Sequence, residues 1–315
     1  MDRRTFVKSL SLGMLWTTVA WRWPASVRAS QQDVGAFHRF KVGSFKCLVL
    51  NEGVFPKVSV DVLFGDAPKE LLKELLSKYD IRGDSIDISL NPLVVDTGSQ
   101  IVLIDTGFGE RAERSNLPAG KLVANMAAAG LRPNDVDYVI LTHSHTDHFG
   151  GITDENGEPV FARAKHFIRK AEWDFAEQQG GWRHEKLVSI RGLLELIESD
   201  VEVVSGVRTK GASGHTPGHT MVNVQSEGEQ LLSVADLLGH DIHVEHPEWS
   251  MRQEIYPDKA AAVRRKVLEA AAREDTLLHA YHLGLPGLGR VVREKESLKW
   301  QPELVNVGVA RRGAA

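Results

Sequence analysis

The amino-acid sequence predicts an α/β protein built as a four-layer αβ/βα sandwich. Segments typical of strands and helices occur in two sets, one before and one after about residue 195. Histidine and aspartate residues stand where several of the predicted strands end. Loops held by a rigid scaffold are a common place for functional side chains. We therefore expect two packed sheets, flanked by helices, that carry a polar site at one edge.

The first set of elements follows from the periodicity of its apolar residues. The predicted strands are 37–42, 45–50, 93–95, 101–104 and 138–142. The predicted helices are 68–78, 121–129, 170–178 and 185–198. Helix 68–78 places leucines on one face, which is typical of a helix that packs against a core. Gly130 ends helix 121–129, because glycine readily adopts the left-handed backbone that closes a helix.

The second set of elements follows about residue 195. Residues 221–224 are predicted to form a strand after a turn rich in glycine and proline. Apolar runs at 231–235 and 277–281 each lead to an aspartate or a histidine. Helix 258–272 follows Pro257, and a helix tolerates proline at its first position. These segments complete the second half of the predicted sandwich.

A dense group of histidines follows the apolar run 138–142. The motif HSHTDH supplies His143, His145, Asp147 and His148 within six residues. Imidazole and carboxylate groups suit zinc and similar divalent ions. The spacing allows the first two histidines to reach one ion while the aspartate and the last histidine reach a neighbouring ion. A solvated histidine-rich loop is the alternative, but so much buried polarity at a strand end is unfavourable without a cation.

The same side-chain types recur at three later boundaries. The turn GHTPGHT at 214–220 carries His215 and His219. Asp236 follows one apolar run, and His282 follows another. Taken alone, Asp236 is typical of a helix cap or a surface carboxylate, and His282 of a hydrogen-bonded or exposed histidine. Their joint order favours a metal site.

In this order the motifs resemble the metallo-β-lactamase-fold superfamily of hydrolases. The resemblance runs from about residue 37 to about residue 309. It rests on LIDTG at 103–107, HSHTDH, GHTPGHT, Asp236 and His282. HLGLPGLG at 282–289 is similar to the HLxFPGIG stretch of the methyl parathion hydrolase and lactonase-like branch. Leu285 replaces the usual Phe of that branch, which affects the substrate pocket more than the metals. Ala235 replaces the usual Gly and adds one methyl group.

The resemblance implies a role for each of these residues. The implied ligands are His143, His145 and His219 for a first ion, Asp147, His148 and His282 for a second, and Asp236 as the bridge. Asp105 would brace the site without binding a metal. His215 would lie outside the ligand set, since the superfamily is expected to use the second histidine of the pair. Two divalent ions, zinc foremost, roughly 3.5–4 Å apart need a bridging anion, which a carboxylate with a hydroxide supplies.

The implied function is a dinuclear metal-dependent hydrolase of small uncharged esters, lactones or phosphotriesters. A metal-bridging water would lose a proton near neutral pH, because two cations lower its pKa to roughly 7. The hydroxide would attack a carbonyl or phosphoryl centre, and one ion would stabilise the developing negative charge. Asp147 or Asp236 would accept or shuttle the proton. No protein nucleophile is required.

Two other functions fit parts of the pattern. A non-catalytic exported metal-binding protein would need neither the bridging Asp236 nor an open coordination position. A metal-dependent oxidoreductase of the same fold is the other alternative. The di-iron flavoproteins of the superfamily use a glutamate where this chain has His145, and they carry a flavin domain; this sequence shows neither feature.

The remaining residues of note have two interpretations each. Trp173, Phe175 and Trp182 are either core residues or the wall of an apolar substrate pocket. His240, His243 and His246 indicate a rim of the active-site cleft, with a further metal site as the alternative. Cys47, the sole cysteine, is predicted to be a buried strand residue that forms no intramolecular disulfide.

The N-terminal segment has the pattern of an export signal. The predicted division is a twin-arginine signal peptide at 1–29 and a hydrolase domain at 30–315. Arg3 and Arg4 precede a short apolar stretch at 9–20, and small residues up to Ala29 offer a cleavage site. The stretch is too short for an ordinary membrane span. We therefore expect a periplasmic or otherwise exported protein whose mature form is not stably inserted in a membrane. The alternative is an uncleaved anchor.

The composition favours a soluble globular domain with a small-molecule substrate. Hydrophobic residues make up 42% of the chain and charged residues 25%, which is ordinary for such a domain. Cleavage after Ala29 removes five basic residues and one acidic residue, so the formal charge changes by −4, from −4 to −8. An acidic body disfavours nucleic acid as a partner, because phosphates need a basic surface. A homodimer is compatible with this interpretation.

The export signal leads to a first prediction. Replacing both arginines, by Arg3→Lys with Arg4→Lys, should strand the full-length precursor in the cytoplasm, because this signal is read by a receptor. The unchanged protein should accumulate outside the inner membrane and begin at Ser30. Cell fractionation with N-terminal sequencing of the exported form decides the matter. Normal export of the double variant would show that another type of signal operates.

Overall fold

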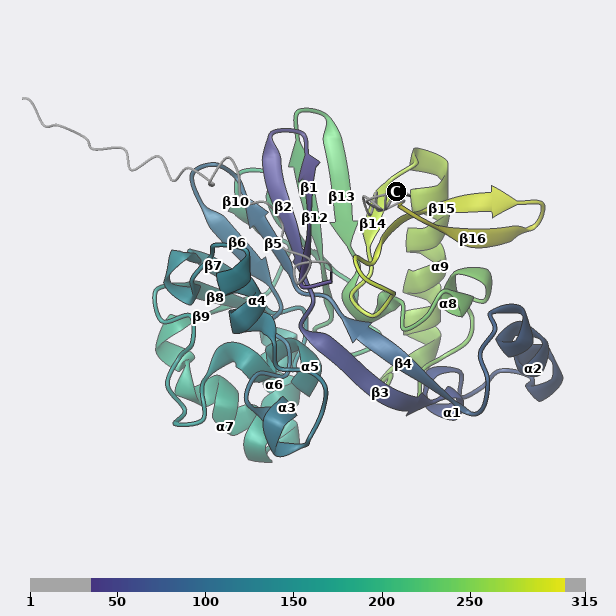
Figure 1. Cartoon of the computed structure of the whole chain (residues 1–315), viewed down its shortest axis with the longest axis horizontal. Coiled ribbons are helices and arrows are strands. Elements are labelled where there is room, and N and C mark those ends of the chain that lie inside the picture. The colour runs from purple at the N-terminus through teal and green to yellow at the C-terminus, as the bar shows by residue number, and fades with distance from the viewer. Residues whose placement is uncertain (1–34, 304–315) are drawn as a thin grey trace, which may run out of the picture.

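Two seven-stranded sheets pack face to face, and each carries helices on its outer side (Figure 1). The computed structural model describes residues 35–303, and the predicted signal peptide at 1–29 lies outside the described residues. The predicted α/β class and the four-layer αβ/βα arrangement are confirmed. Within the described residues, no helix combines the length and the apolar character that crossing a membrane requires.

The first sheet has the strand order β1-β2-β5-β6-β7-β8-β9. Its strands are β1 (Phe37–Val42), β2 (Phe45–Leu50), β5 (Leu93–Asp96), β6 (Ile101–Ile104), β7 (Tyr138–Ile140), β8 (Lys165–Arg169) and β9 (Leu194–Ile197). The strands from β6 to β9 pair in parallel. The helices of this half are α3 (Arg111–Arg114), α4 (Leu122–Ala128), α5 (Thr146–Phe149), α6 (Lys170–Gln179) and α7 (Gly181–Ser189). Short 3-10 turns lie at η1 (Pro133–Asp135), η2 (Gly150–Ile152) and η3 (Arg191–Leu193).

The second sheet follows the chain in strict order from β10 to β16. Its strands are β10 (Glu202–Val204), β11 (Val207–Gly211), β12 (Thr220–Ser226), β13 (Glu229–Ser233), β14 (Leu277–His279), β15 (Leu288–Glu294) and β16 (Ser297–Pro302). Only β13 and β14 pair in parallel, and the long helix α9 (Pro257–Glu274) connects them. The 3-10 turn η4 (Ala235–Leu237) and the short helix α8 (Ile242–Glu245) lie in the same connection.

The apolar core is divided by the layers. Between the two sheets, Val49 and Val95 of the first sheet lie in one buried cluster with Val222 and Val224 of the second. Outside the first sheet, a second cluster includes residues of α4, α6 and α7. Outside the second sheet, Leu268 of α9 belongs to a third cluster. The sheets are thus held at a fixed separation, which a site spanning their edges requires.

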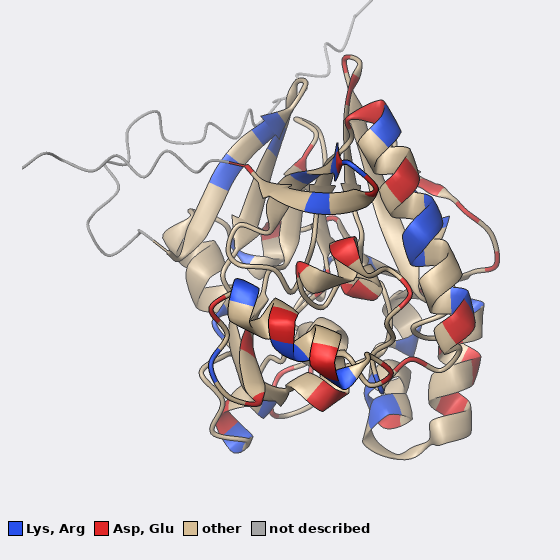
Figure 2. Ribbon diagram, turned by 90° about the vertical axis from the view of Figure 1, so that its right-hand side faces the viewer, with Lys and Arg blue, Asp and Glu red and all other residues tan. Residues whose placement is uncertain are grey.

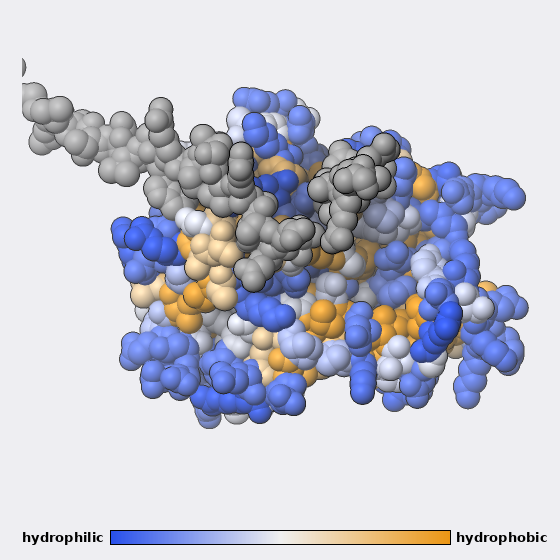
Figure 3. Space-filling model, viewed as in Figure 1, coloured by the Kyte–Doolittle hydropathy of each residue, from blue (hydrophilic) through white to orange (hydrophobic). Residues whose placement is uncertain are grey.

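A two-stranded sheet that the sequence did not predict stands beside the main body. It consists of β3 (Gly53–Ser59) and β4 (Ser85–Leu90), which pair antiparallel, with helices α1 (Val60–Leu63) and α2 (Lys69–Lys78) in its connection. The predicted helix at 68–78 is α2. Leu72 and Leu75 are buried against this sheet, whereas Leu71 is exposed. Figure 3 shows hydrophobic surface in the region of β3 and β4.

One predicted element is wrong in its second half. Residues 185–198 are not a continuous helix, because α7 ends at Ser189 and Leu194–Ile197 form the edge strand β9. Leucine and isoleucine recur there every three or four residues, a spacing that also fits a short strand with Leu194 and Ile197 buried. The two halves therefore divide after β9.

The buried position of Cys47 in β2 is confirmed, and burial raises the pKa of its thiol to about 12.

Candidate metal centre

The predicted metal-binding residues come from four loops at one edge of the two sheets. HSHTDH follows β7 of the first sheet, and the GHTPGHT turn joins β11 to β12 of the second. Asp236 lies in η4 just beyond β13, and His282 lies just beyond β14. These strands end together because β13 and β14 are parallel neighbours. Residues far apart in the chain are thus brought to one place.

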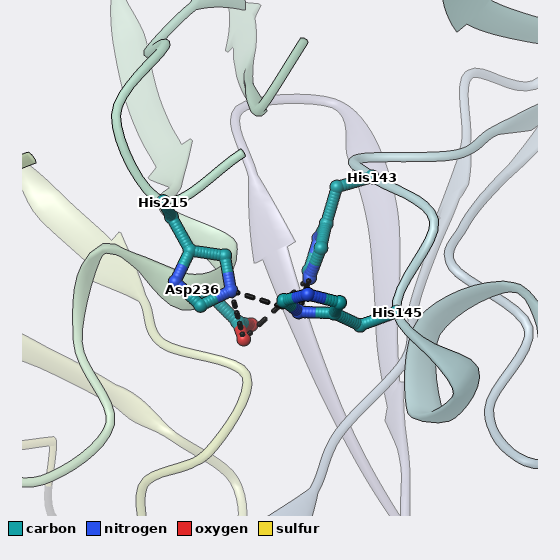
Figure 4. Close-up of side chains that lie close together, drawn as sticks. All are labelled: His143, His145, His215 and Asp236. Atoms are coloured by element: carbon teal, nitrogen blue, oxygen red, sulfur yellow. Dashed lines mark hydrogen bonds and ion pairs between the residues drawn. The ribbon is translucent and has the colours of Figure 1, made fainter. Parts of the chain in front are cut away.

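A first group of ligand atoms consists of three histidines and one carboxylate (Figure 4). His145 Nδ1 lies 3.0 Å from His143 Nε2 and 3.0 Å from His215 Nε2. Asp236 Oδ2 lies 3.1 Å from His215 Nε2 and 3.6 Å from His143 Nε2. The four atoms lie within 4.8 Å of one another. Their number and type suit a single zinc-like ion.

A second group lies directly beside the first. His148 Nε2 and His282 Nε2 are 3.4 Å apart, and each lies 3.6 Å from Asp147 Oδ2. Asp236 Oδ1 lies 2.8 Å from His148 Nε2 and 3.2 Å from His282 Nε2. The two oxygens of Asp236 therefore face different groups, as a bridging carboxylate must.

The structure differs from the sequence-based ligand assignment at His215 and His219. His215 Nε2 faces the first group, whereas both ring nitrogens of His219 contact the backbone. His219 Nδ1 donates to the carbonyl of Ala212 at 3.2 Å, and its Nε2 accepts from the N–H of Asp236 at 3.2 Å. His219 is therefore a buried support beneath Asp236. Its place immediately before β12 directs it into the sheet, while His215 lies earlier in the turn.

Hydrogen bonds behind the ligands fix which ring nitrogen faces the centre. Asp105 Oδ2 lies 2.8 Å from His148 Nδ1, and the carbonyl of Ser89 lies 3.0 Å from His282 Nδ1. Such contacts orient an imidazole and leave its other nitrogen free for a metal. Asp105 also accepts from the N–H and the hydroxyl of Thr142, both at 2.8 Å. It lies behind the ligand groups, where a bracing residue would lie.

The electrostatics of the centre favour bound cations. Burial lowers the pKa of His143 and of His145 well below its ordinary value, so both imidazoles are neutral with a free lone pair. Burial alone would raise the pKa of Asp236, but His148 and His282 hold it well below the ordinary range. Asp236 Oδ1 is buried, and its near neighbours are the ring nitrogens of His148 and His282. His143 and His145 beside this carboxylate are neutral, whereas the charge of Asp236, acting against burial, raises the pKa of His148 and of His282. A buried negative charge that draws protons onto two imidazoles fits a site for divalent cations.

A buried glutamate that the sequence did not single out joins the two ligand loops. Glu172 of α6 accepts from the N–H of Ser144 at 2.9 Å and from its hydroxyl at 2.6 Å. Its other oxygen accepts from the Thr216 hydroxyl at 2.6 Å and the Gly218 N–H at 3.0 Å. A Cβ on Gly218 would lie 2.4 Å from the backbone nitrogen of Glu172, so only glycine allows this approach. The sequence gives no signal for this role, because Glu172 lies in an ordinary polar helix.

A buried ion pair anchors the loops on the other side. Arg264 of α9 pairs with Glu254 and donates to the carbonyls of Leu237 and Trp249. The residue after Glu254, Ile255, donates its N–H to the carbonyl of His215 at 3.0 Å. These contacts connect α9 with the chain on both sides of the bridging aspartate. Removing one partner of such a pair typically costs about 3–5 kcal/mol.

The backbone immediately before Asp236 is left-handed. Ala235 has φ 46°, and it stands where the resembled superfamily usually has glycine. The left-handed conformation disfavours a residue with a Cβ by roughly 1–2 kcal/mol. Ala235 is nevertheless buried in place, so the surrounding loop outweighs this strain.

The ligand groups open into a cavity of about 600 Å³. Asp147, Asp236 and His282 lie at its polar end. The rest of its lining is largely apolar and includes Phe55 of β3 and Ile88 of β4. The two-stranded sheet therefore forms part of the cavity wall.

The other aromatic and histidine residues singled out from the sequence lie outside the ligand groups and outside the cavity lining. Phe175 is buried, and Trp173 and Trp182 pack against the core cluster outside the first sheet. His243 is buried, and its Nε2 contacts the carbonyl of Leu63 at 3.0 Å. His246 stacks on Trp249. The groups of metal-ligand atoms among the described residues do not include these histidines.

An αβ/βα sandwich with two adjoining groups of histidine and aspartate at one edge defines a dinuclear metalloprotein. The chain belongs to the metallo-beta-lactamase superfamily, whose family model matches residues 89–282. That match contains all the residues of both ligand groups. The family resemblance of the sequence motifs is thus confirmed.

The proteins to which the chain is similar include lactonases. An N-acyl homoserine lactonase of Bacillus sp is 29% identical over 170 residues, which cover 48% of this chain and 65% of the relative. The corresponding lactonase of Bacillus cereus is 28% identical over 166 residues, which cover 48% of this chain and 64% of the relative. The chain thus matches slightly less than two thirds of the length of these relatives.

Two solved structures cover nearly the whole described chain. AidC, a dizinc quorum-quenching lactonase in complex with the product N-hexanoyl-L-homoserine, has a TM-score of 0.79 at 28% identity. The match covers 87% of this chain and 99% of AidC. The hydrolase AbOPH has a TM-score of 0.74 at 24% identity, over 86% of this chain and 98% of AbOPH, and supports the fold alone.

The geometry leads to a prediction about the two histidines of the turn. His215→Ala should lose one bound ion, because its Nε2 faces the first group. His219→Ala should retain both ions, although its thermal stability should fall with the loss of buried hydrogen bonds. Elemental analysis of protein purified without chelator should find about two divalent ions in the unchanged protein. Retention of both ions by His215→Ala, with loss from His219→Ala, would restore the sequence-based assignment.

A further prediction concerns Glu172. In Glu172→Gln, the amide nitrogen would face hydrogen-bond donors on at least one of the two loops. We expect a loss of about 1–3 kcal/mol in the free energy of unfolding, together with weaker retention of metal. Thermal unfolding and competition with a chelator measure the two effects. Glu177→Gln, on the exposed side of the same helix, is the matched control. Unchanged metal retention in Glu172→Gln would contradict the role in aligning the loops.

Proposed function

We propose that the protein is a dinuclear metal-dependent hydrolase of lactones, with N-acyl homoserine lactones as its substrate class. The observation that carries this proposal is the sharing of Asp236 between two ligand groups at the polar end of a largely apolar cavity. The Bacillus lactonases and AidC support the choice of substrate class. Bound ions, which we propose to be zinc, would supply an activated water and polarise the scissile carbonyl.

The side chains of the centre have different roles in the proposed reaction. The five histidines would hold the ions through ring nitrogens, and hydrogen bonds from behind fix the orientation of His148 and His282. Asp147 and Asp236 both line the cavity, and Asp147 is the more exposed of the two. We assign them to accept the proton of the attacking water and to return it to the ring oxygen that leaves. Tyr281 donates its hydroxyl to the carbonyl of Asp147 at 2.6 Å and so fixes the backbone there.

The cavity walls would bind the rest of the substrate. Phe55, Val58 and Ile88 from the two-stranded sheet offer apolar surface for an acyl chain. Burial of such a chain contributes about 0.8 kcal/mol for each methylene group. Arg111 and Arg183 also line the cavity and can attract the carboxylate that lactone opening produces. Small esters and phosphotriesters also suit a largely apolar cavity, so they belong in the substrate panel.

The remaining aspects of function extend the same proposal. Figure 2 shows basic and acidic residues interspersed over one side of the molecule, which supports a small-molecule partner over a nucleic acid. Export through the segment at 1–29 would place the enzyme outside the inner membrane. Lactones that diffuse through the surroundings of the cell would meet it there.

Turnover assays test the proposed function. The metal-loaded protein should open N-hexanoyl homoserine lactone, and exhaustive chelation should abolish the activity. Added zinc, manganese or cobalt should restore it, and the rates would identify the preferred ion. Asp236→Asn should lose most turnover, because the neutral amide is a poor bridge between cations. An enzyme that hydrolyses aryl esters or phosphotriesters but no lactone would overturn the substrate class. Chelator-insensitive hydrolysis would overturn the metal dependence.

A further inference from the structure

One polar side chain in the cavity wall has no assigned role. Gln253 lies in the segment between α8 and α9 and lines the cavity together with Asp236 and His145. Its side-chain oxygen Oε1 is buried and accepts no hydrogen bond within the described residues. Its Nε2 makes a long contact of 3.9 Å with the sulfur of Met251. Buried polar atoms normally have partners, so an unsatisfied one in a binding cavity indicates a partner on the ligand.

The backbone around Gln253 is firmly held. The next residue, Glu254, is ion-paired with Arg264 and donates its N–H to the carbonyl of Met251 at 3.0 Å. Ile255 then donates to the carbonyl of His215, which belongs to the first ligand group. The carboxamide of Gln253 is therefore attached, over two residues, to the loop that carries a metal-ligand residue. The backbone from which this carboxamide extends is correspondingly fixed relative to the metal centre.

The carboxylates of Asp147 and Asp236 are also acceptors in the cavity wall, but both belong to the metal centre. Arg111 and Arg183 can only donate hydrogen bonds. Ser115 is an exposed residue, and Thr146 belongs to the histidine loop. Oε1 of Gln253 is a neutral, buried acceptor of the kind that an amide N–H requires.

We propose that Gln253 determines specificity by accepting a hydrogen bond from the amide N–H of an N-acylated lactone. This inference rests on the proposed lactonase function and adds a residue that recognises the amide group between the lactone ring and the acyl chain. The hydrogen bond satisfies the buried oxygen and directs the acyl chain along the apolar wall. A lactone with an alkyl chain and no amide leaves the oxygen unsatisfied, and is therefore a poorer substrate.

The test compares two lactones of similar size, with and without the amide. N-Hexanoyl homoserine lactone carries the amide, and γ-decalactone does not. Gln253→Met keeps the length of the side chain and removes the acceptor. We expect kcat/KM for the N-acyl lactone to fall about tenfold, as for one hydrogen bond, while that for γ-decalactone is unchanged or rises. Gln178→Met, on the exposed surface of α6, is the matched control and should alter neither value.

The possible outcomes separate the inference from the proposed function. An equal fall for both lactones, or no fall for either, would overturn the role of Gln253, provided that metal content and thermal unfolding match the unchanged protein. If the unchanged protein opens neither lactone, the proposed function fails. Calorimetric binding of N-hexanoyl homoserine and of 4-hydroxydecanoate then decides the inference. Selective weakening of the amide-containing ligand in Gln253→Met supports it, and equal affinities for the variant and the unchanged protein overturn it.

Discussion

The carboxylate of Glu172 holds the two halves of the metal centre in register. One of its oxygens accepts two hydrogen bonds from Ser144 in the first half, and the other accepts from Thr216 and Gly218 in the second. Both partner loops carry residues of the first ligand group. A small slide of one sheet against the other would therefore break this set of bonds before it changed the apolar core. The valine-rich layer between the sheets sets their separation, and Glu172 sets their alignment.

The residues of the second ligand group are also held in place by contacts on the side away from the metal centre. His148 and His282 reach the centre through Nε2, because Asp105 and the carbonyl of Ser89 face the opposite nitrogens. Asp236 receives support from His219, which accepts the backbone N–H of Asp236. Arg264 holds the chain that follows Asp236 by donating to the carbonyl of Leu237. The ligands are thus held by residues with ordinary sequence patterns, so the geometry of the centre depends on the whole fold.

The sequence predicts features that depend on residues close together in the chain. It does not predict features that depend on contacts between distant residues. The HSHTDH cluster and the two-sheet architecture were predictable, because local spacing and strand periodicity carry them. The choice between His215 and His219 was not, since both lie in one turn and their direction depends on where β12 begins. The role of Glu172 depends on contacts with two distant loops. The strand β9 was mistaken for helix because Leu194 and Ile197 suit either structure until β8 supplies a partner. The two-stranded sheet that walls the cavity gave no signal strong enough to predict it.

The ligand residues are widely separated along the chain, and this separation has a consequence for folding. His148 and His282 are 134 positions apart, and His145 and His215 are 70 apart, yet each pair meets within hydrogen-bonding range. Closing such long loops is entropically unfavourable, and contacts of this range form slowly. The centre can be complete only after both sheets have docked. Metal uptake would then mark the end of folding. Because the ions would bind the complete centre and not partly folded chains, bound metal would shift the folding equilibrium toward the native protein by mass action.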